Sequence, residues 1–167
     1  VGFLYVRRSL LDRLEPPFTD LHAATWTARD RFEWRPDARR FENWEGNVAA
    51  KIGLGVAVDY ALAVGLPAIR DRVTTLAARL RDGLRAIPGV KVRDLGPHPC
   101  AIVTFDASSR DALEIRDTLR PRGINVSVTT LTSTRLDMEA RGLLALVRAS
   151  VHYYNTEAQV DRFCAEL

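Results

Sequence analysis

The order of its amphipathic segments predicts a small α+β domain over residues 66–167 of this 167-residue chain. Apolar residues recur at helical spacing over 66–84. Four later stretches are short and rich in β-branched residues or alternate between apolar and polar side chains, as strands do. They are residues 90–94, 101–105, 124–128 and 146–154. Two helical stretches lie among or after these strands, so we predict an antiparallel sheet covered by helices.

Residues 1–65 are predicted to contain a strand at 2–6, a long aromatic stretch and a helix. From residue 17 to 45 no period persists, yet all three tryptophans of the chain lie there. Aromatic side chains on irregular backbone are typical of an interface or the wall of a site, and a local aromatic core is the other interpretation. Because this part holds so little sheet, we expect it to be the tail of a larger domain.

A helix is predicted from Val48 to the residue before Gly65, with Asn47 as its N-cap. Its residues are apolar almost all round, which predicts burial on several sides. Pro67 suits the first position of the next helix.

Two further helices have predicted caps. Ser108 with Asp111 is expected to begin one, and Thr156 with Gln159 forms a capping box for the last.

The composition indicates a globular protein and argues against two classes of partner. Hydrophobic residues make up 47% of the chain and charged residues 27%. The net charge is only +3, and no compact basic run with interleaved aromatics occurs, so we expect no nucleic-acid partner. No apolar run approaches twenty residues, so we expect no membrane partner either. Cys100 and Cys164 offer neither a disulfide framework nor a metal spacing, which predicts a cytoplasmic setting.

Arg148 is the strongest single candidate for a site residue. It lies on the polar face of the last predicted strand, with Ser150 and His152. The planar guanidinium offers two parallel donors to a carboxylate, so an arginine on a stiff strand can anchor a ligand. A structural ion pair is an equal alternative on this evidence.

Other candidates are weaker. His152 is interpreted as a structural histidine more readily than as an acid–base group, and Cys100 as a buried small hydrophobe more readily than as a nucleophile. The hydroxyl-rich segment 129–135 either wraps a polar ligand or is a solvated loop. The aspartates show no metal-ligand spacing.

Three motifs in order resemble the C-terminal part of class V aminotransferases. They are Gly2-Phe-Leu-Tyr-Val-Arg, Arg40-Phe-Glu-Asn-Trp-Glu-Gly-Asn47 before a Gly-rich helix, and Arg148-Ala-Ser-Val-His-Tyr-Tyr-Asn-Thr-Glu. The resemblance implies an α/β, fold-type I enzyme that uses pyridoxal 5′-phosphate (PLP), acts on an amino acid and forms a homodimer. It also implies that residues 1–65 are the tail of the large PLP-binding domain and 66–167 the small domain.

The resemblance also assigns residues. It implies that Arg148 binds the substrate α-carboxylate, that Ser127 lies in the substrate site, and that Glu45, Gly46 and Asn47 approach the cofactor phosphate of the other subunit. The Schiff-base lysine is expected upstream of Val1, since neither of the two lysines of the chain matches its context. We therefore expect the 167 residues alone to bind no PLP covalently and to be inactive.

One departure from the family pattern concerns sulfur chemistry. Group II cysteine desulfurases carry an arginine where this chain has Ser127, followed by a cysteine that forms a persulfide. No cysteine lies between Gly123 and Arg148, which argues against persulfide-type cysteine desulfurase chemistry. Transamination, epimerisation and C–S lyase chemistry stay open. The alternative is a non-catalytic module that binds a small molecule or regulates a partner.

Overall fold

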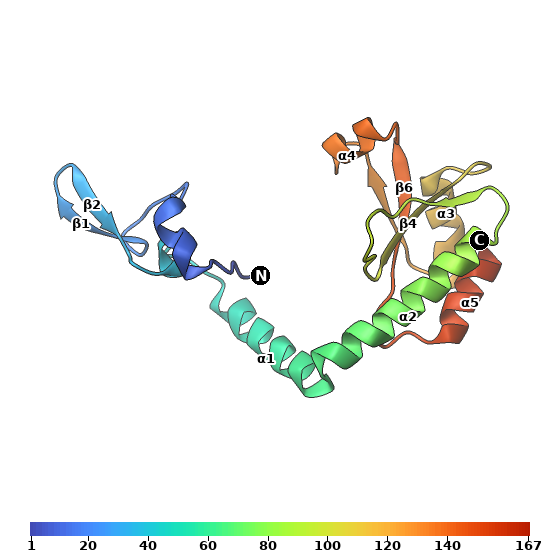
Figure 1. The fold of residues 1–167 in the computed structure, drawn as a ribbon, viewed down its shortest axis with the longest axis horizontal. Coiled ribbons are helices and arrows are strands. Elements are labelled where there is room, and N and C mark those ends of the chain that lie inside the picture. Colours follow the sequence, from blue (N-terminus) through green and yellow to red (C-terminus); the bar gives the residue numbers. More distant parts are fainter. The chain divides into compact units, whose positions relative to one another are not determined.

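The computed structural model describes all residues, 1–167, and divides the chain into two compact units (Figure 1). The first unit is Val1–Ala63 and the second is Val64–Leu167. Assignment of the first unit to a large PLP-binding domain stays a prediction.

The first unit contains a β-hairpin where the sequence predicted an irregular aromatic stretch. Its elements are η1 (Arg8–Arg13), β1 (Ala24–Ala28), β2 (Arg31–Trp34), η2 (Ala38–Phe41) and α1 (Val48–Val64). β1 and β2 are antiparallel, with Trp26 opposite Phe32. The hairpin was missed because its turn at Arg29 and Asp30 has none of the glycine or asparagine signals of tight hairpins. The strand predicted at 2–6 is absent, since no segment of the chain pairs with it.

Helix α1 has the predicted bounds but not the predicted burial. The side chain of Asn47 caps it by accepting a hydrogen bond from the Ala50 N–H at 2.9 Å. Gly65, with φ of +97°, ends it in a conformation that favours glycine. No residue of α1 is buried within the chain, so the expectation of burial on several sides is wrong for these 167 residues.

No single helix is long and apolar enough to cross a bilayer. α1 and α2 pass that test of length and composition only as a pair, taken across the break between them.

The second unit is the predicted antiparallel sheet covered by helices. Its elements are α2 (Leu66–Arg85), β3 (Val90–Val92), β4 (Ile102–Ala107), α3 (Ala112–Leu119), η3 (Arg120–Arg122), β5 (Ser127–Thr130), α4 (Arg135–Ala140), β6 (Ala145–Ser150) and α5 (Glu157–Glu166). The strand order is β3-β4-β6-β5, and each neighbouring pair is antiparallel. β6, which carries Arg148, is therefore an interior strand.

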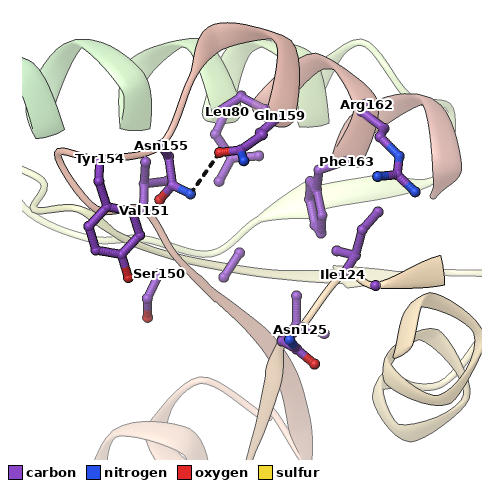
Figure 2. Close-up of a pocket in the computed structure, with 14 residues that line it drawn as sticks. Leu80, Ile124, Asn125, Ser150, Val151, Tyr154, Asn155, Gln159, Arg162 and Phe163 are labelled. Atoms are coloured by element: carbon purple, nitrogen blue, oxygen red, sulfur yellow. Dashed lines mark hydrogen bonds between the residues drawn. The ribbon is translucent and has the colours of Figure 1, made fainter. Parts of the chain in front are cut away.

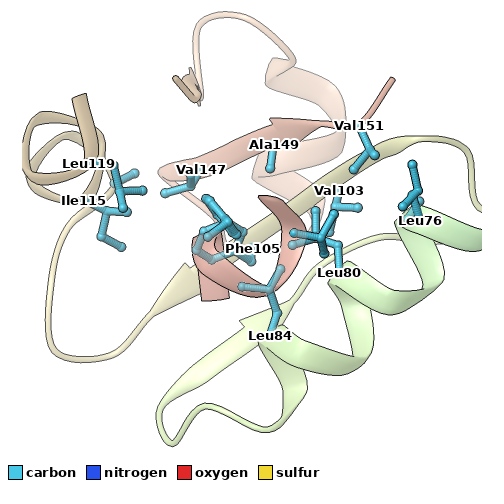
Figure 3. Close-up of a cluster of buried hydrophobic side chains, with 14 residues drawn as sticks. Leu76, Leu80, Leu84, Val103, Phe105, Ile115, Leu119, Val147, Ala149 and Val151 are labelled. Atoms are coloured by element: carbon cyan, nitrogen blue, oxygen red, sulfur yellow. The ribbon is translucent and has the colours of Figure 1, made fainter. Parts of the chain in front are cut away.

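The core lies on one face of this sheet. Alternate residues of β4 and β6 point into it, and the helices supply the rest (Figure 3). Phe105 on β4 and Phe163 on α5 meet edge to face with ring centroids 6.1 Å apart. The principal side chains are Leu76, Leu80 and Leu84 of α2, Val103 and Phe105 of β4, Ile115 and Leu119 of α3, Val147 and Ala149 of β6, and Val160 and Phe163 of α5. By alternation, Thr104 and Arg148 belong to the opposite face.

Several element boundaries differ from the prediction. β5 begins at Ser127 rather than at residue 124, and β6 ends at Ser150, so His152 lies outside the strand. Asp111 alone caps α3 by accepting from the Glu114 N–H, so the Ser108 cap is wrong. The capping box of Thr156 and Gln159 before α5 is confirmed.

Candidate functional site

A cavity of about 460 Å³ opens beside the sheet face that carries Arg148. Its wall combines β4, β5 and β6 with α4 and the connection from β3 to β4. Leu146 and Met138, which belong to a small second apolar cluster, line it as well. The cavity therefore has an apolar part and a strongly charged part.

Four arginines line this cavity, and only one of them lacks an acidic partner. Three make ion pairs: Arg81 with Asp94 at 2.7 Å, Arg93 with Asp106 at 2.8 Å and Arg141 with Asp137 at 2.8 Å. The hydrogen bonds that Arg93 donates to the Asp106 carboxylate raise the pKa of Arg93. Arg148 makes no ion pair, and its guanidinium makes no hydrogen bond to any residue of the chain. This arrangement favours the ligand-anchor interpretation of Arg148 over a structural ion pair.

The backbone of Arg148 is held from both sides. It lies opposite Thr104 of β4 and opposite Ser127 of β5. The Ser127 hydroxyl contacts the carbonyl oxygen of Arg148 at 3.5 Å, which is a long hydrogen bond. The structure thus places the two predicted substrate-site residues side by side on neighbouring strands, and their roles stay predictions.

A nearly buried ion pair supports the cavity wall, and no local pattern of residues predicts it. The Arg81 and Asp94 side chains are only 6% and 13% exposed. Arg81 also donates to the carbonyl oxygens of Cys100 at 2.6 Å and Ile102 at 3.2 Å. Asp94 Oδ1 accepts from both the backbone N–H and the hydroxyl of Thr104, each at 2.7 Å. Both carboxylate oxygens of Asp94 and two of the three guanidinium nitrogens of Arg81 are therefore hydrogen-bonded within the wall of the cavity.

Two weaker candidates lie elsewhere than expected. Cys100 is an exposed free thiol that lines the cavity, so its interpretation as a buried hydrophobe is wrong. It lies in the connection that precedes β4, and its side chain is exposed there. The His152 ring stacks on Tyr154 and contacts Tyr153 at a tilt, with both centroid distances 4.3 Å, and it does not line the cavity.

The hydroxyl-rich segment 129–135 contributes two side chains to the cavity, Thr129 and Thr134. Thr134 precedes α4 but makes no side-chain capping bond. Both hydroxyls are therefore available to a polar ligand. No group of three or more His, Cys, Asp or Glu residues is placed to hold a metal ion.

A second cavity, of about 380 Å³, lies between the end of β6, the segment before β5 and α5 (Figure 2). Its charged side chain, Arg162, and the amides of Asn155 and Gln159 already have partners. Asn155 donates to Gln159 at 3.0 Å, the contact drawn in Figure 2, and Arg162 donates to the carbonyl oxygen of Arg122 at 2.8 Å. Without an unpaired charge, this cavity has less to offer a charged ligand than the one at Arg148.

The predicted cofactor segment lies in the first unit, at the start of α1. Glu45, Gly46 and Asn47 are all exposed. The N–H groups of Val48 and Ala49 have no acceptor in the chain, while Asn47 already caps the Ala50 N–H. Free N–H groups at the start of a 17-residue helix fit a phosphate. The Glu45 carboxylate would repel one, so a fit depends on the backbone donors.

The family model described as aminotransferase class V matches residues 1–163. The chain belongs to the class V aminotransferase family. Enzymes of this family depend on PLP, which confirms the expected cofactor. The solved structures that superpose on the chain confirm the predicted α/β fold class.

Individual relatives are all longer than this chain. A cysteine desulfurase of Cronobacter sakazakii is 33% identical over 170 residues, covering 100% of this chain and 41% of that protein. The crystal structure of the Escherichia coli cysteine desulfurase CsdA superposes with a TM-score of 0.79 at 21% identity, covering 97% of this chain and 40% of that one. The cystine C–S lyase C-DES, solved with its product cysteine persulfide, gives a TM-score of 0.74 at 19% identity over 96% and 40% of the two chains.

These relatives correct one expectation from the sequence. Ser127 and the lack of a cysteine between Gly123 and Arg148 argued against persulfide-type cysteine desulfurases. The named relatives are cysteine desulfurases, including one that is 33% identical, so that expectation is wrong. The missing cysteine between Gly123 and Arg148 concerns only where a persulfide would form on the protein. It does not determine which bond of the substrate is cleaved.

Proposed function

We propose that this chain is the C-terminal part of a PLP-dependent enzyme that cleaves the carbon–sulfur bond of cysteine or a close derivative. The chain spans about 40% of the length of its relatives, so the activity belongs to the full-length protein. Family membership supports an enzyme over a non-catalytic binding module. The relatives named as cysteine desulfurases and as a C–S lyase support a sulfur-containing substrate.

The observation that carries the proposal is the unpaired guanidinium of Arg148. The other three cavity arginines are matched by three aspartates, which leaves one positive charge for a ligand. An amino acid with an uncharged side chain has one carboxylate, which matches this one positive charge. A planar guanidinium binds both carboxylate oxygens at once and thereby fixes the orientation of the amino acid.

Each remaining part of the chain has a defined task in this proposal. When bound, PLP withdraws electrons from the substrate carbon beside the amino group. The N–H groups of Val48 and Ala49 would hold the phosphate of the PLP bound by the partner subunit. Thr129 and Thr134 would line the space for the substrate side chain, with Leu146 and Met138 as its apolar part. Ser127 does not line the cavity itself, and it would act through its position beside Arg148 on β5.

The test is Arg148→Ala in the full-length enzyme, with kcat and KM measured for L-cysteine. A charge-assisted hydrogen bond contributes about 1.5–3 kcal/mol, so kcat/KM should fall roughly ten- to a hundredfold. Arg116→Ala is the matched control, because Arg116 lies on α3 and pairs with Asp117 away from the cavity lining. An unchanged kcat/KM in Arg148→Ala would remove this residue from the role.

We also propose that the full-length protein is a cytoplasmic homodimer without a nucleic-acid partner. Exposed apolar side chains on α1, among them Ile52, Val56 and Tyr60, support a covered surface in the whole enzyme. The two free cysteines support a reducing compartment, and the net charge of +3 argues against nucleic acid. Light scattering of the full-length protein tests the dimer, and cell fractionation tests the compartment.

A further inference from the structure

We propose that Thr104, held by Asp94 and Arg81, positions the guanidinium of Arg148 for carboxylate binding. This inference rests on the proposed function, because it concerns the same anchor. Thr104 and Arg148 are directly opposite each other across β4 and β6. Side chains opposite each other on one sheet face have Cβ atoms about 4.5–5.5 Å apart, so the two are neighbours. Both line the same cavity.

Because the Thr104 hydroxyl donates its hydrogen to Asp94, it can act only as an acceptor toward other groups. Thr104 Oγ1 donates its only hydrogen to Asp94 Oδ1, at 2.7 Å. The oxygen is therefore left as an acceptor toward the cavity. A guanidinium has five N–H donors and no acceptor, and a bidentate carboxylate engages only two of them. The guanidinium of Arg148 makes no hydrogen bond to Thr104 in this structure. We therefore place the contact in the ligand-bound state, where Thr104 offers an acceptor to the N–H groups of Arg148 that the carboxylate leaves free.

A hydroxyl without this support could not do the same. Free to rotate, it could donate to the substrate carboxylate and compete with Arg148 for it. Asp94 prevents this rotation, and Asp94 is itself held at its other oxygen by Arg81 at 2.7 Å. Because the pair is almost completely buried and its polar atoms are satisfied, the geometry is rigid.

The fold itself has little need of the Thr104 hydroxyl. The backbone N–H of Thr104 bonds Asp94 independently, and Arg81 keeps its other partners. Valine is close in shape to threonine and suits a strand. Thr104→Val therefore removes the proposed acceptor while leaving the sheet and the buried ion pair in place.

The experiment measures ligand binding to the full-length, PLP-loaded enzyme through the absorbance change of the cofactor. The two probes are L-alanine and ethylamine, which share an amino group but differ in the carboxylate. Loss of one hydrogen bond costs about one tenfold factor in affinity, so Thr104→Val should weaken L-alanine about tenfold. Ethylamine should change less than twofold, and Thr104→Ser, which keeps the hydroxyl, should restore L-alanine binding. Thr118→Val on the exposed surface of α3 is the matched control.

The possible outcomes distinguish failure of the proposed role of Thr104 from failure of the proposed function. Equal weakening of both probes in Thr104→Val would show a structural role, and no weakening of L-alanine would show no role; either result overturns the inference. Thr104→Ala, which also removes the hydroxyl and leaves the buried ion pair in place, provides a second test if Thr104→Val is poorly folded, with the same selective loss expected. If Arg148→Ala also leaves the preference for L-alanine unchanged, the proposed function fails with it. If Arg148→Ala abolishes that preference while Thr104→Val does not, only the inference fails.

Discussion

Gly83 on α2 lies against the thiol of Cys164 on α5. A Cβ added at Gly83 would stand 2.7 Å from Sγ of Cys164, closer than such atoms approach in folded proteins. The missing side chain therefore sets how near the two helices can pack. Cys164 is half-buried at this contact, and burial raises the pKa of its thiol.

Gly83→Ala tests this contact against helix propensity. Alanine favours a helix interior over glycine by about 1 kcal/mol, yet overpacking costs about 1–3 kcal/mol. We expect Gly83→Ala alone to leave the free energy of unfolding unchanged or lower. In a Cys164→Ala background the same change should raise it by about 1 kcal/mol. Urea unfolding of the four proteins in this double-mutant cycle checks the prediction, which fails if the two changes are additive.

Glu157 on α5 predicts part of the acid sensitivity of the second unit. The Arg72 side chain bonds this carboxylate and lowers its pKa from 4.5 to about 2. Because the pKa of Glu157 is lower in the folded protein than in the unfolded chain, its carboxylate stabilises the fold at pH values above 4.5. This stabilisation is lost as the pH falls from 4.5 through about 2. Glu157→Gln should therefore flatten this part of the stability curve.

Urea unfolding at pH 6, 4 and 3 measures the effect of Glu157→Gln. Glu114→Gln is the control, because Glu114 also lies in the first turn of a helix but makes no ion pair in the chain. Equal pH dependence in wild type and Glu157→Gln would contradict the prediction.

The two cysteines should differ in reactivity. Cys100 is exposed, whereas Cys164 is half-buried with a raised pKa. Because the thiolate is the reactive form, iodoacetamide at neutral pH should alkylate Cys100 well before Cys164. Mass spectrometry of peptides taken over a time course measures both rates. Cys100→Ser should abolish the fast phase of alkylation. A fast phase that persists in this variant would contradict the assignment of Cys100 as the exposed, reactive thiol.

The capping box before α5 predicts a modest effect on stability. The Thr156 hydroxyl accepts a hydrogen bond from the Gln159 N–H at 3.2 Å, and Oε1 of Gln159 accepts one from the Thr156 N–H at 3.1 Å. Replacing a capping threonine by alanine costs about 1 kcal/mol, so Thr156→Ala should lower the free energy of unfolding by that amount. Thr156→Ser keeps the cap and should stay near wild type. Chemical denaturation of both variants distinguishes these results.

Local signals in the sequence located some elements well and others poorly. α1 and α5 have side-chain caps, α2 has Pro67 in its first turn, and all three have apolar patterns, so adjacent residues predict their positions. β5 was placed at 124–128 because that stretch is the more apolar, whereas pairing with β6 selects 127–130. Strand boundaries depend on partners far away in the chain, which a local pattern does not contain.

The site shows the same division between local and distant information. Alternation along β6 put Arg148 on the polar face, and the structure agrees. Whether Arg148 was already paired depended on where Asp94, Asp106 and Asp137 lie, and each of them has another arginine as partner. Charge pairing across 13 residues, as between Arg81 and Asp94, leaves no mark in sequence spacing. The exposure of α1 also depends on surfaces that a helical pattern cannot specify.

The interior position of β6 has a consequence for the entropy of ligand binding. Arg148 stands on backbone that is hydrogen-bonded to β4 on one side and to β5 on the other. A ligand that binds there restricts the rotamers of one side chain and orders no loop. Preorganisation of this kind lowers the entropic cost of association. Hydrogen exchange at the Arg148 amide should therefore be slow already in the free protein and change little when a carboxylate binds.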